Sequence, residues 1–243
     1  MRLRKWDNIP DFMRCDEVRP YYETLVRRRF QLVAKRMFDV VASLILIVIL
    51  ALPMLALALL IRADSSGKVI YRQERVTQYG RIFFIHKFRT MVTDADRKGA
   101  HVTSANDSRI TRIGRFLRKY RMDELPQLFD VICGDMTFVG TRPEVVGYVK
   151  RYTPEMMATL LLPAGITSEA SIRFKDEARM LQDVDSVDET YVAEVLPLKM
   201  KYNLESIMKF SLRHDLVIIL STVMAVLGFK GRDGSDESGG TAQ

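Results

Sequence analysis

The sequence predicts an α+β fold that is mostly helical, with a few short strands and one long apolar helix near the N-terminus. An uncharged apolar run at residues 40–61 reaches the roughly 20 residues that a helix needs to cross a bilayer. Residues 68–72 and 81–88 have the apolar pattern of short strands. Helical spacing follows at residues 110–120, where Ile113 and Leu117 share one face.

The apolar run has two features that a plain membrane crossing does not explain. Lys35 and Arg36 precede the run and Arg62 follows it, so the positive-inside rule chooses no orientation. Pro53 lies inside the run and bends a helix, because proline removes a backbone hydrogen bond. The arms on either side of the proline measure roughly 20 Å and 12 Å at helical rise, so neither spans alone. A helix that bends and returns to the same face and an ordinary kinked spanning helix both remain open.

The chain divides into four segments. Residues 1–34 form a basic N-terminal extension, and residues 35–62 form the membrane helix with its flanks. Residues 63–230 have the mixed pattern of a globular domain. Residues 231–243 are rich in Gly, Ser and Asp, which predicts a disordered tail.

Charge and cysteine content narrow the class of protein. The net charge of +7 is uneven, because basic residues dominate the chain before Met122. A basic half beside an apolar segment fits anionic lipid headgroups and phosphate-bearing substrates. No nucleic-acid-binding motif accompanies the charge, so we expect no nucleic-acid partner. Cys15 and Cys133 belong to no CxxC pair, which argues against a disulfide framework or a zinc site.

Asp123 and Glu124 form the candidate catalytic pair. A helical pattern at residues 123–133, ending at Gly134, makes Asp123 the expected N-cap. The surrounding cations favour a functional role, because arginine forks match phosphate oxygens. These cations are Arg112, Arg115, Arg118, Lys119, Arg121 and Arg142. Two carboxylates in that setting suit Mg²⁺, and a carboxylate can also act as a nucleophile.

Several sequence blocks follow one another in a characteristic order. They are Lys35-Arg36-Met37-Phe38-Asp39, Tyr71-Arg72-Gln73-Glu74-Arg75, His86-Lys87-Phe88-Arg89-Thr90-Met91, Ser108-Arg109-Ile110-Thr111-Arg112-Ile113-Gly114-Arg115-Phe116-Leu117-Arg118, Asp123-Glu124-Leu125-Pro126-Gln127-Leu128, Gly134-Asp135-Met136-Thr137-Phe138-Val139-Gly140-Thr141-Arg142-Pro143-Glu144 and Pro163-Ala164-Gly165-Ile166-Thr167. In these blocks the chain resembles the bacterial sugar transferase family, the monotopic polyprenyl-phosphate phosphoglycosyl transferases. The resemblance covers about residues 35–228.

That resemblance implies an enzyme with a small catalytic domain. Asp123 would attack the β-phosphate of a UDP-sugar and release UMP, and a polyprenyl phosphate such as undecaprenyl phosphate would then attack the aspartyl intermediate. Glu124, together with Asp123, would bind Mg²⁺. The phosphate-binding residues would be Lys87, Arg89, Arg118 and Arg142.

The resemblance also implies a cellular location. The membrane segment of the family is re-entrant, which favours a helix that returns to the cytoplasmic face of the bacterial inner membrane. The product would start the assembly of an exopolysaccharide, a capsule, an O-antigen or a glycoprotein glycan. Membrane lipids are expected partners, and a homo-oligomer is compatible with the sequence.

Two departures from the family pattern bear on the membrane helix and the site. The family often has Ser-Pro at the membrane break, where this chain has Leu52-Pro53. The Pro-Arg-Pro of the family is Thr141-Arg142-Pro143 here, so the arginine stands on a less rigid loop.

Two other classes of protein share some of these features. A non-catalytic membrane scaffold of a glycan assembly complex would have the same anchor and basic surface, but it has no need of both Asp123 and Glu124. A membrane-tethered nucleic-acid-binding protein would show binding that weakens steeply with salt.

Overall fold

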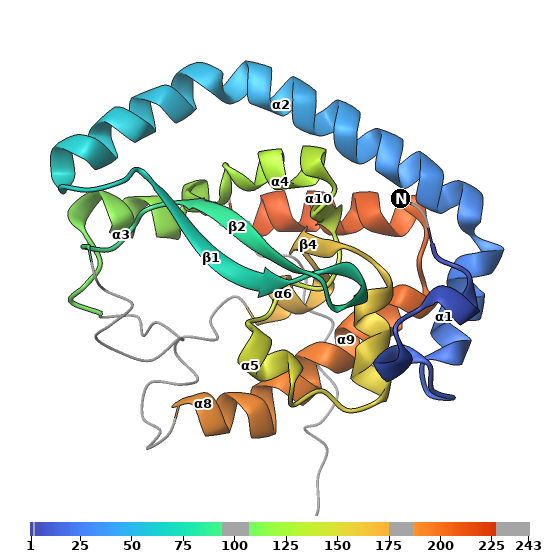
Figure 1. The fold of residues 1–243 in the computed structure, drawn as a ribbon. Helices are drawn as coiled ribbons and strands as arrows, with labels where there is room; N and C mark the ends of the chain where they lie inside the picture. Colours follow the sequence, from blue (N-terminus) through green and yellow to red (C-terminus); the bar gives the residue numbers. More distant parts are fainter. Residues whose placement is uncertain (2, 94–106, 175–186, 227–243) are drawn as a thin grey trace, which may run out of the picture.

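The computed structural model describes residue 1 and residues 3–93, 107–174 and 187–226. The described chain is mostly helical, with short strands and one long apolar helix near the N-terminus, which confirms the predicted fold class (Figure 1). In chain order the elements are α1 (Arg19–Arg27), α2 (Arg29–Asp64), β1 (Ile70–Val76), β2 (Ile82–Phe88), α3 (Arg112–Lys119), α4 (Gln127–Cys133), β3 (Met136–Val139), α5 (Val146–Val149), β4 (Ala164–Thr167), α6 (Glu169–Arg173), α8 (Val187–Thr190), α9 (Leu196–Met208) and α10 (Leu212–Val226). The predicted tail at residues 231–243 lies outside the described residues.

Two separate pairs of strands support the domain. β1 and β2 form an antiparallel hairpin in which Ile70 pairs with Phe88 and Val76 with Ile82. These are the two predicted strands, although the first begins and ends later than residues 68–72. β3 and β4 form a parallel pair that the sequence pattern did not predict. Each of these strands has four residues, which is too short for alternation to be recognised.

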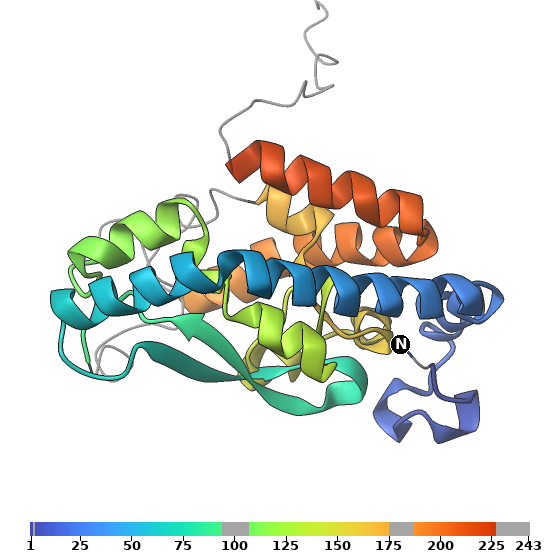
Figure 2. The same cartoon turned by 90° about the horizontal axis from the view of Figure 1, so that it is seen from above.

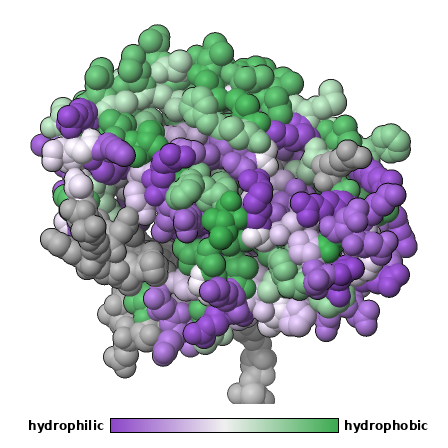
Figure 3. Space-filling view, viewed as in Figure 1, coloured by the Kyte–Doolittle hydropathy of each residue, from purple (hydrophilic) through white to green (hydrophobic). Residues whose placement is uncertain are grey.

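Helix α2 passes through Pro53 without interruption and arches over the domain (Figure 1). Its 36 residues span about 54 Å at helical rise, well over the roughly 30 Å of a bilayer's hydrocarbon core. Its most apolar window of 18 residues has a mean hydropathy of 3.2 and is 11% buried. The side of the molecule formed by α2 is accordingly almost continuously apolar in Figure 3. The structure therefore contains a bent helix, not two helices separated by a break.

Both ends of α2 rest on the same domain. Near the N-terminal end, Arg36 donates hydrogen bonds of 2.6 and 2.9 Å to the carbonyl oxygens of Val131 and Ile132, at the end of α4. At the other end, Ile61 is 2% exposed and packs with Phe88 and Leu117. Seen from above, α4 and α10 lie on opposite sides of α2 (Figure 2). Between these ends, no residue from 44 to 60 is fully buried, so the apolar middle of the helix is largely exposed.

The N-terminal extension packs onto the domain. Ile9, Met13, Val18 and Leu25 are buried in one hydrophobic cluster together with side chains from η6 (Glu155–Leu161) and α9. Helix α1 has its apolar residues on one side, which directs Leu25 into this cluster. Residues 1–34 therefore contribute to the core, a role that their basic composition did not indicate.

Candidate active site

Asp123 and Glu124 lie in the short turn η5 (Met122–Glu124), between α3 and α4. Arg121 has a positive φ of 56°, which ends α3 and reverses the chain just before the pair. The expectation that Asp123 caps a helix at residues 123–133 is wrong, because α4 begins at Gln127 and its N-cap is Pro126. Proline lacks an N–H and has a fixed φ, so it suits the start of a helix. The predicted end at Gly134 is confirmed by its left-handed conformation, with a φ of 88°.

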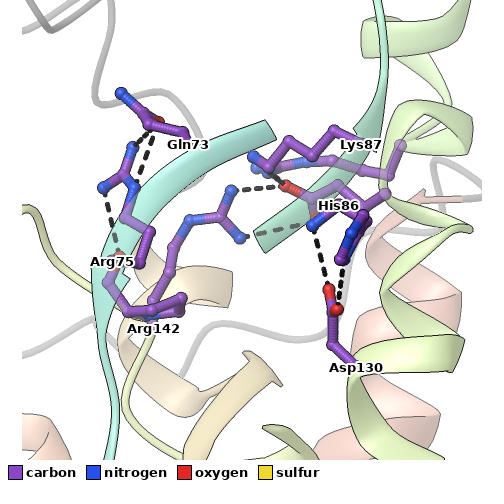
Figure 4. A network of polar contacts seen from close by, with 9 residues as sticks. Gln73, Arg75, His86, Lys87, Asp130 and Arg142 are labelled. Atoms are coloured by element: carbon purple, nitrogen blue, oxygen red, sulfur yellow. Dashed lines mark hydrogen bonds and ion pairs between the residues drawn. The ribbon is translucent and has the colours of Figure 1, made fainter. Parts of the chain in front are cut away.

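Glu124 is enclosed by cations. Its Oε1 accepts a hydrogen bond of 3.2 Å from Lys87 Nζ, and Arg142 binds both of its carboxylate oxygens. Arg121 Nη1 lies 3.7 Å from Oε1. Burial alone would raise the pKa of Glu124, but the charges of Arg142 and Lys87 outweigh it and hold this pKa well below its usual range. Figure 4 shows Arg142 and Lys87 reaching the carboxylate from two sides.

Asp123 has the opposite electrostatic character. Its Oδ1 is buried and has no hydrogen-bond partner among the residues that the structure describes. Burial raises the pKa of Asp123, and the neighbouring charge of Glu124 raises it further, against the opposing effect of Lys87 and Arg118. A carboxylate oxygen that accepts no hydrogen bond keeps its lone pairs available, which is what a nucleophile requires.

Local structure places the surrounding cations. Arg118 lies in the last turn of α3; burial lowers its pKa, and the charge of Asp123 is the largest opposing influence. Arg142 follows β3, on a loop held by a 2.8 Å hydrogen bond from Gly165 N to the carbonyl oxygen of Thr141. Glycine is required at position 165, because an added Cβ would lie 2.2 Å from the carbonyl oxygen of Gly140.

A contact between β2 and α4 sets the position of Lys87. The carboxylate of Asp130 accepts hydrogen bonds from the backbone N–H of His86, at 3.0 Å, and from its ring Nδ1, at 2.6 Å (Figure 4). This double contact fixes the strand at the residue before Lys87. The ammonium group is thereby directed toward the turn that carries Glu124.

Five of the six predicted site residues surround one place in the structure. They are Lys87, Arg118, Asp123, Glu124 and Arg142. Arg89 is not part of this group, because its guanidinium donates to the carbonyl oxygens of Ser65 and Ser66 at 2.6 and 2.8 Å. It is 8% exposed and binds the chain where α2 ends. Arg89 therefore binds the chain at the C-terminal end of α2.

The structure adds Arg75 to this group of cations. Its Nη1 donates to the carbonyl oxygen of Pro143 at 3.1 Å, and its Nε and Nη2 donate to Gln73 Oε1 at 3.1 and 2.6 Å (Figure 4). The charge of Arg142 lowers the pKa of Arg75, after the larger effect of burial. Arg75 belongs to the block Tyr71-Arg72-Gln73-Glu74-Arg75, but the sequence pattern assigned it no role.

The carboxylate pair can be compared with what Mg²⁺ requires. Among the described residues, no group of three or more His, Cys, Asp or Glu side chains could hold a metal ion. Mg²⁺ is often bound by only one or two carboxylates together with substrate phosphates. The unpartnered Oδ1 of Asp123 beside the carboxylate of Glu124 fits that kind of site. Arginines and a lysine around two adjacent acids can bind phosphate oxygens together with a hard cation.

The chain belongs to the bacterial sugar transferase family, because the model of that family matches residues 30–229. It is 35% identical over 183 residues to the UDP-N-acetylgalactosamine-undecaprenyl-phosphate N-acetylgalactosaminephosphotransferase of Aeromonas hydrophila. That alignment covers 74% of this chain and 40% of that protein. It is 36% identical over 183 residues to the UDP-glucose:undecaprenyl-phosphate glucose-1-phosphate transferase of Xanthomonas campestris pv. campestris, covering 73% of this chain and 35% of that protein.

A shorter relative shares more of its length with this chain. The UDP-glucose:undecaprenyl-phosphate glucose-1-phosphate transferase of Caulobacter vibrioides is 34% identical over 179 residues, which covers 72% of this chain and 63% of that protein. The chain therefore spans between 35% and 63% of the length of these three curated relatives.

Proposed function

We propose that this protein transfers a sugar 1-phosphate from a UDP-sugar to a membrane polyprenyl phosphate, such as undecaprenyl phosphate, and releases UMP. The observation that carries the proposal is Asp123, a partly buried residue whose Oδ1 is buried and has no hydrogen-bond partner among the described residues, with Lys87, Arg118 and Arg142 nearby. The named activities of the relatives support the reaction type. The product would initiate a polyprenyl-linked glycan, such as an exopolysaccharide, a capsule, an O-antigen or a glycoprotein glycan.

The reaction proceeds in two displacements at one phosphorus atom. In the first, an Asp123 oxygen bonds to the β-phosphorus, the bond to the α,β-bridging oxygen breaks, and UMP leaves with the electron pair. In the second, a phosphate oxygen of the polyprenyl phosphate bonds to the same phosphorus and the bond to Asp123 breaks. A covalent route of this kind divides one difficult transfer into two easier steps.

The cations of the site stabilise charge in both displacements. Lys87, Arg118 and Arg142 stand where negative charge gathers on the transferred phosphoryl group, and in a site with little water such charges act strongly. Asp123 and Glu124 would together hold Mg²⁺, which when bound neutralises the oxygens of the diphosphate. Glu124 stays ionised at neutral pH because its pKa is depressed, so it keeps Arg142 and Lys87 in place.

The membrane helix is proposed to be re-entrant. Both ends of α2 contact one domain, and the apolar middle of the arch stands clear of it (Figure 1). Beside it, α10 has a second exposed apolar row that continues this surface, made of Leu216, Val217, Leu220, Val223 and Met224. The domain would then lie on the cytoplasmic face of the inner membrane, where a soluble UDP-sugar and a lipid-bound acceptor can meet.

Cysteine labelling tests the re-entrant topology. Single cysteines replace the exposed residues Arg29 and Ala63, at the two ends of α2, in a protein whose Cys15 and Cys133 are changed to serine. A membrane-impermeant thiol reagent should label both positions in inside-out vesicles and neither in intact cells. Labelling of the two positions from opposite faces would show a spanning helix and end the proposal of re-entry.

The reaction is tested by UMP release. Membranes containing the protein are supplied with Mg²⁺, polyprenyl phosphate and a panel of UDP-sugars, and UMP is measured. Asp123→Asn should abolish release, whereas the matched control Asp135→Asn should retain it, because Asp135 pairs with Arg81 at 2.5 Å away from the site. A membrane scaffold without chemistry would support glycan production equally well in cells with Asp123→Asn, and that result would overturn the proposal.

A further inference from the structure

Glu144 is a buried carboxylate that follows Arg142 by two residues. It is 7% exposed, and its Oε1 accepts a hydrogen bond of 2.6 Å from the hydroxyl of Tyr191. Lys199 Nζ donates to the same hydroxyl at 2.9 Å and lies 3.7 Å from Glu144 Oε1. Tyr191 comes from the π-helical turn η7 (Tyr191–Val195) and Lys199 from α9, so a distant part of the chain fixes this carboxylate.

The backbone around Glu144 is bound to strand β1. The carbonyl oxygen of Glu144 accepts a 3.0 Å hydrogen bond from Val76 N, and the preceding carbonyl, of Pro143, accepts the bond from Arg75. The loop that carries Arg142 and the strand that carries Arg75 are therefore joined directly at Glu144. A shift of the backbone at residue 144, which carries this carboxylate, would be transmitted to both the loop of Arg142 and the strand of Arg75.

The charge of Glu144 also acts on both guanidiniums. Burial lowers the pKa of Arg75, and Glu144 is the largest influence in the opposite direction. The pKa of Arg142 is raised mainly by Glu124, and Glu144 adds to that effect. Two buried guanidiniums near one another repel, so an anion between the strand and the loop stabilises them as a pair.

We propose that Glu144, fixed by Tyr191 and Lys199, is a positioning residue that holds Arg75 beside Arg142 so that both guanidiniums bind the diphosphate of the UDP-sugar. Arginine forks suit the oxygens of a diphosphate, and fixing them before binding lowers the entropy cost of association. This inference rests on the proposed function, because it names a further part of the same site.

A purely structural role for this network makes a different prediction. If Glu144 only held the fold together, its loss would lower stability and weaken every nucleotide to a similar degree. If it positions two arginines for the terminal phosphate, its loss weakens UDP much more than UMP, which lacks that phosphate. The ratio of the UDP and UMP dissociation constants therefore separates the two roles.

Tyr191→Phe is the sharpest variant, because it removes one hydroxyl and keeps the ring, whose centroid lies 4.8 Å from that of Tyr148. We expect UDP to bind about tenfold more weakly and UMP within about twofold of the wild type, since a hydrogen bond to a charged group is lost. Tyr152→Phe is the matched control, as Tyr152 lies in the same buried cluster and makes no hydrogen bond to Glu144 that the structure records. It should change neither affinity.

Glu144→Gln is the second variant and should show the same selective loss, because glutamine accepts the hydrogen bond but supplies no charge. The affinities are measured by calorimetry on the purified full-length protein. Equal losses for UDP and UMP, or no loss for UDP in either variant, would overturn the inference. If the wild-type protein bound UDP in this way but released no UMP from any UDP-sugar, the proposed function would fail while the positioning role stood.

Discussion

Lys35 and Asp215 form a buried ion pair that joins α2 to α10. Their side chains are 3% and 10% exposed, and Lys35 Nζ lies 2.6 Å from Asp215 Oδ2. Lys35→Met keeps an unbranched apolar side chain but leaves the buried carboxylate of Asp215 without its cation. Removal of one partner from a buried pair costs about 3–5 kcal/mol, so we expect a loss of stability of that size.

The pH dependence of this loss follows from the pKa of Asp215. Burial raises this pKa above its usual 3.8, and Lys35 is the strongest opposing influence, so the variant raises it further. An acid whose pKa is higher in the folded state destabilises the fold as pH rises above the unfolded value. The difference between Lys35→Met and the wild type should therefore be largest at neutral pH and shrink as the pH falls toward 3.8.

The assay is a double-mutant cycle on the protein in lipid nanodiscs, followed by unfolding at neutral and acidic pH. Lys35→Met with Asp215→Leu should recover to within about 1 kcal/mol of the wild type, because no unpaired charge remains. Lys209→Met is the control; its partner Glu205 lies 3.3 Å away, but the side chains are 63% and 42% exposed, so a loss of about 0.5 kcal/mol at most is expected. A Lys35→Met protein no less stable than this control would refute the reasoning.

Three further outcomes test other parts of the structure. Glu124→Gln should make the free energy of unfolding depend less on pH in the acid range. A carboxylate with a depressed pKa stabilises the fold at pH values above its unfolded pKa of 4.5 and loses that contribution as the pH falls below it. An unchanged pH dependence in acid unfolding would contradict this. Arg89→Met should lower stability by about 1–3 kcal/mol, since it removes the donor to the carbonyl of Ser65 and leaves the carbonyl of Ser66 to the Thr93 hydroxyl, yet leave the affinity for UDP unchanged. Calorimetry showing weaker UDP binding would instead return Arg89 to the phosphate site. Removal of Mg²⁺ with a chelator should stop UMP release and its return should restore it, and release that continues in the chelator would exclude a magnesium requirement.

The parts of the fold that sequence predicted are those with a strong local signal. The apolar run in α2, the alternation in β2 and the helical spacing of α3 each depend on neighbouring residues. The parallel pair of β3 and β4 depends on a contact between residues 136 and 164, which no local pattern reports. The same holds for the packing of the N-terminal extension, whose buried apolar side chains find their partners on η6 and α9.

The site shows a similar division. The acids at 123 and 124 and the arginines at 118 and 142 were singled out because carboxylates and arginines in one stretch are a chemical signal, whereas Lys87 was assigned from the family resemblance. The structure brings these five residues together. Arg89 was assigned by its neighbourhood in sequence, but Lys87 and Arg89 lie two residues apart and only the first reaches Glu124. Sequence patterns did not relate Arg75 to Glu144, because their relation is made by the hydrogen bonds between a strand and a distant loop.

The two adjacent carboxylates have pKa values shifted in opposite directions, which is consistent with different roles for Asp123 and Glu124. Glu124 receives the hydrogen bonds of Lys87 and Arg142, which lower its pKa and make it a permanent anion. Asp123 Oδ1 accepts no hydrogen bond from the described residues. The nearby cations lower the pKa of Asp123 less than burial and the charge of Glu124 raise it. Groups whose environments separate their pKa values take separate roles. Glu124, the carboxylate that Lys87 and Arg142 stabilise, organises the cations, whereas Asp123, the poorly stabilised one, is the member of the pair that we propose as the nucleophile.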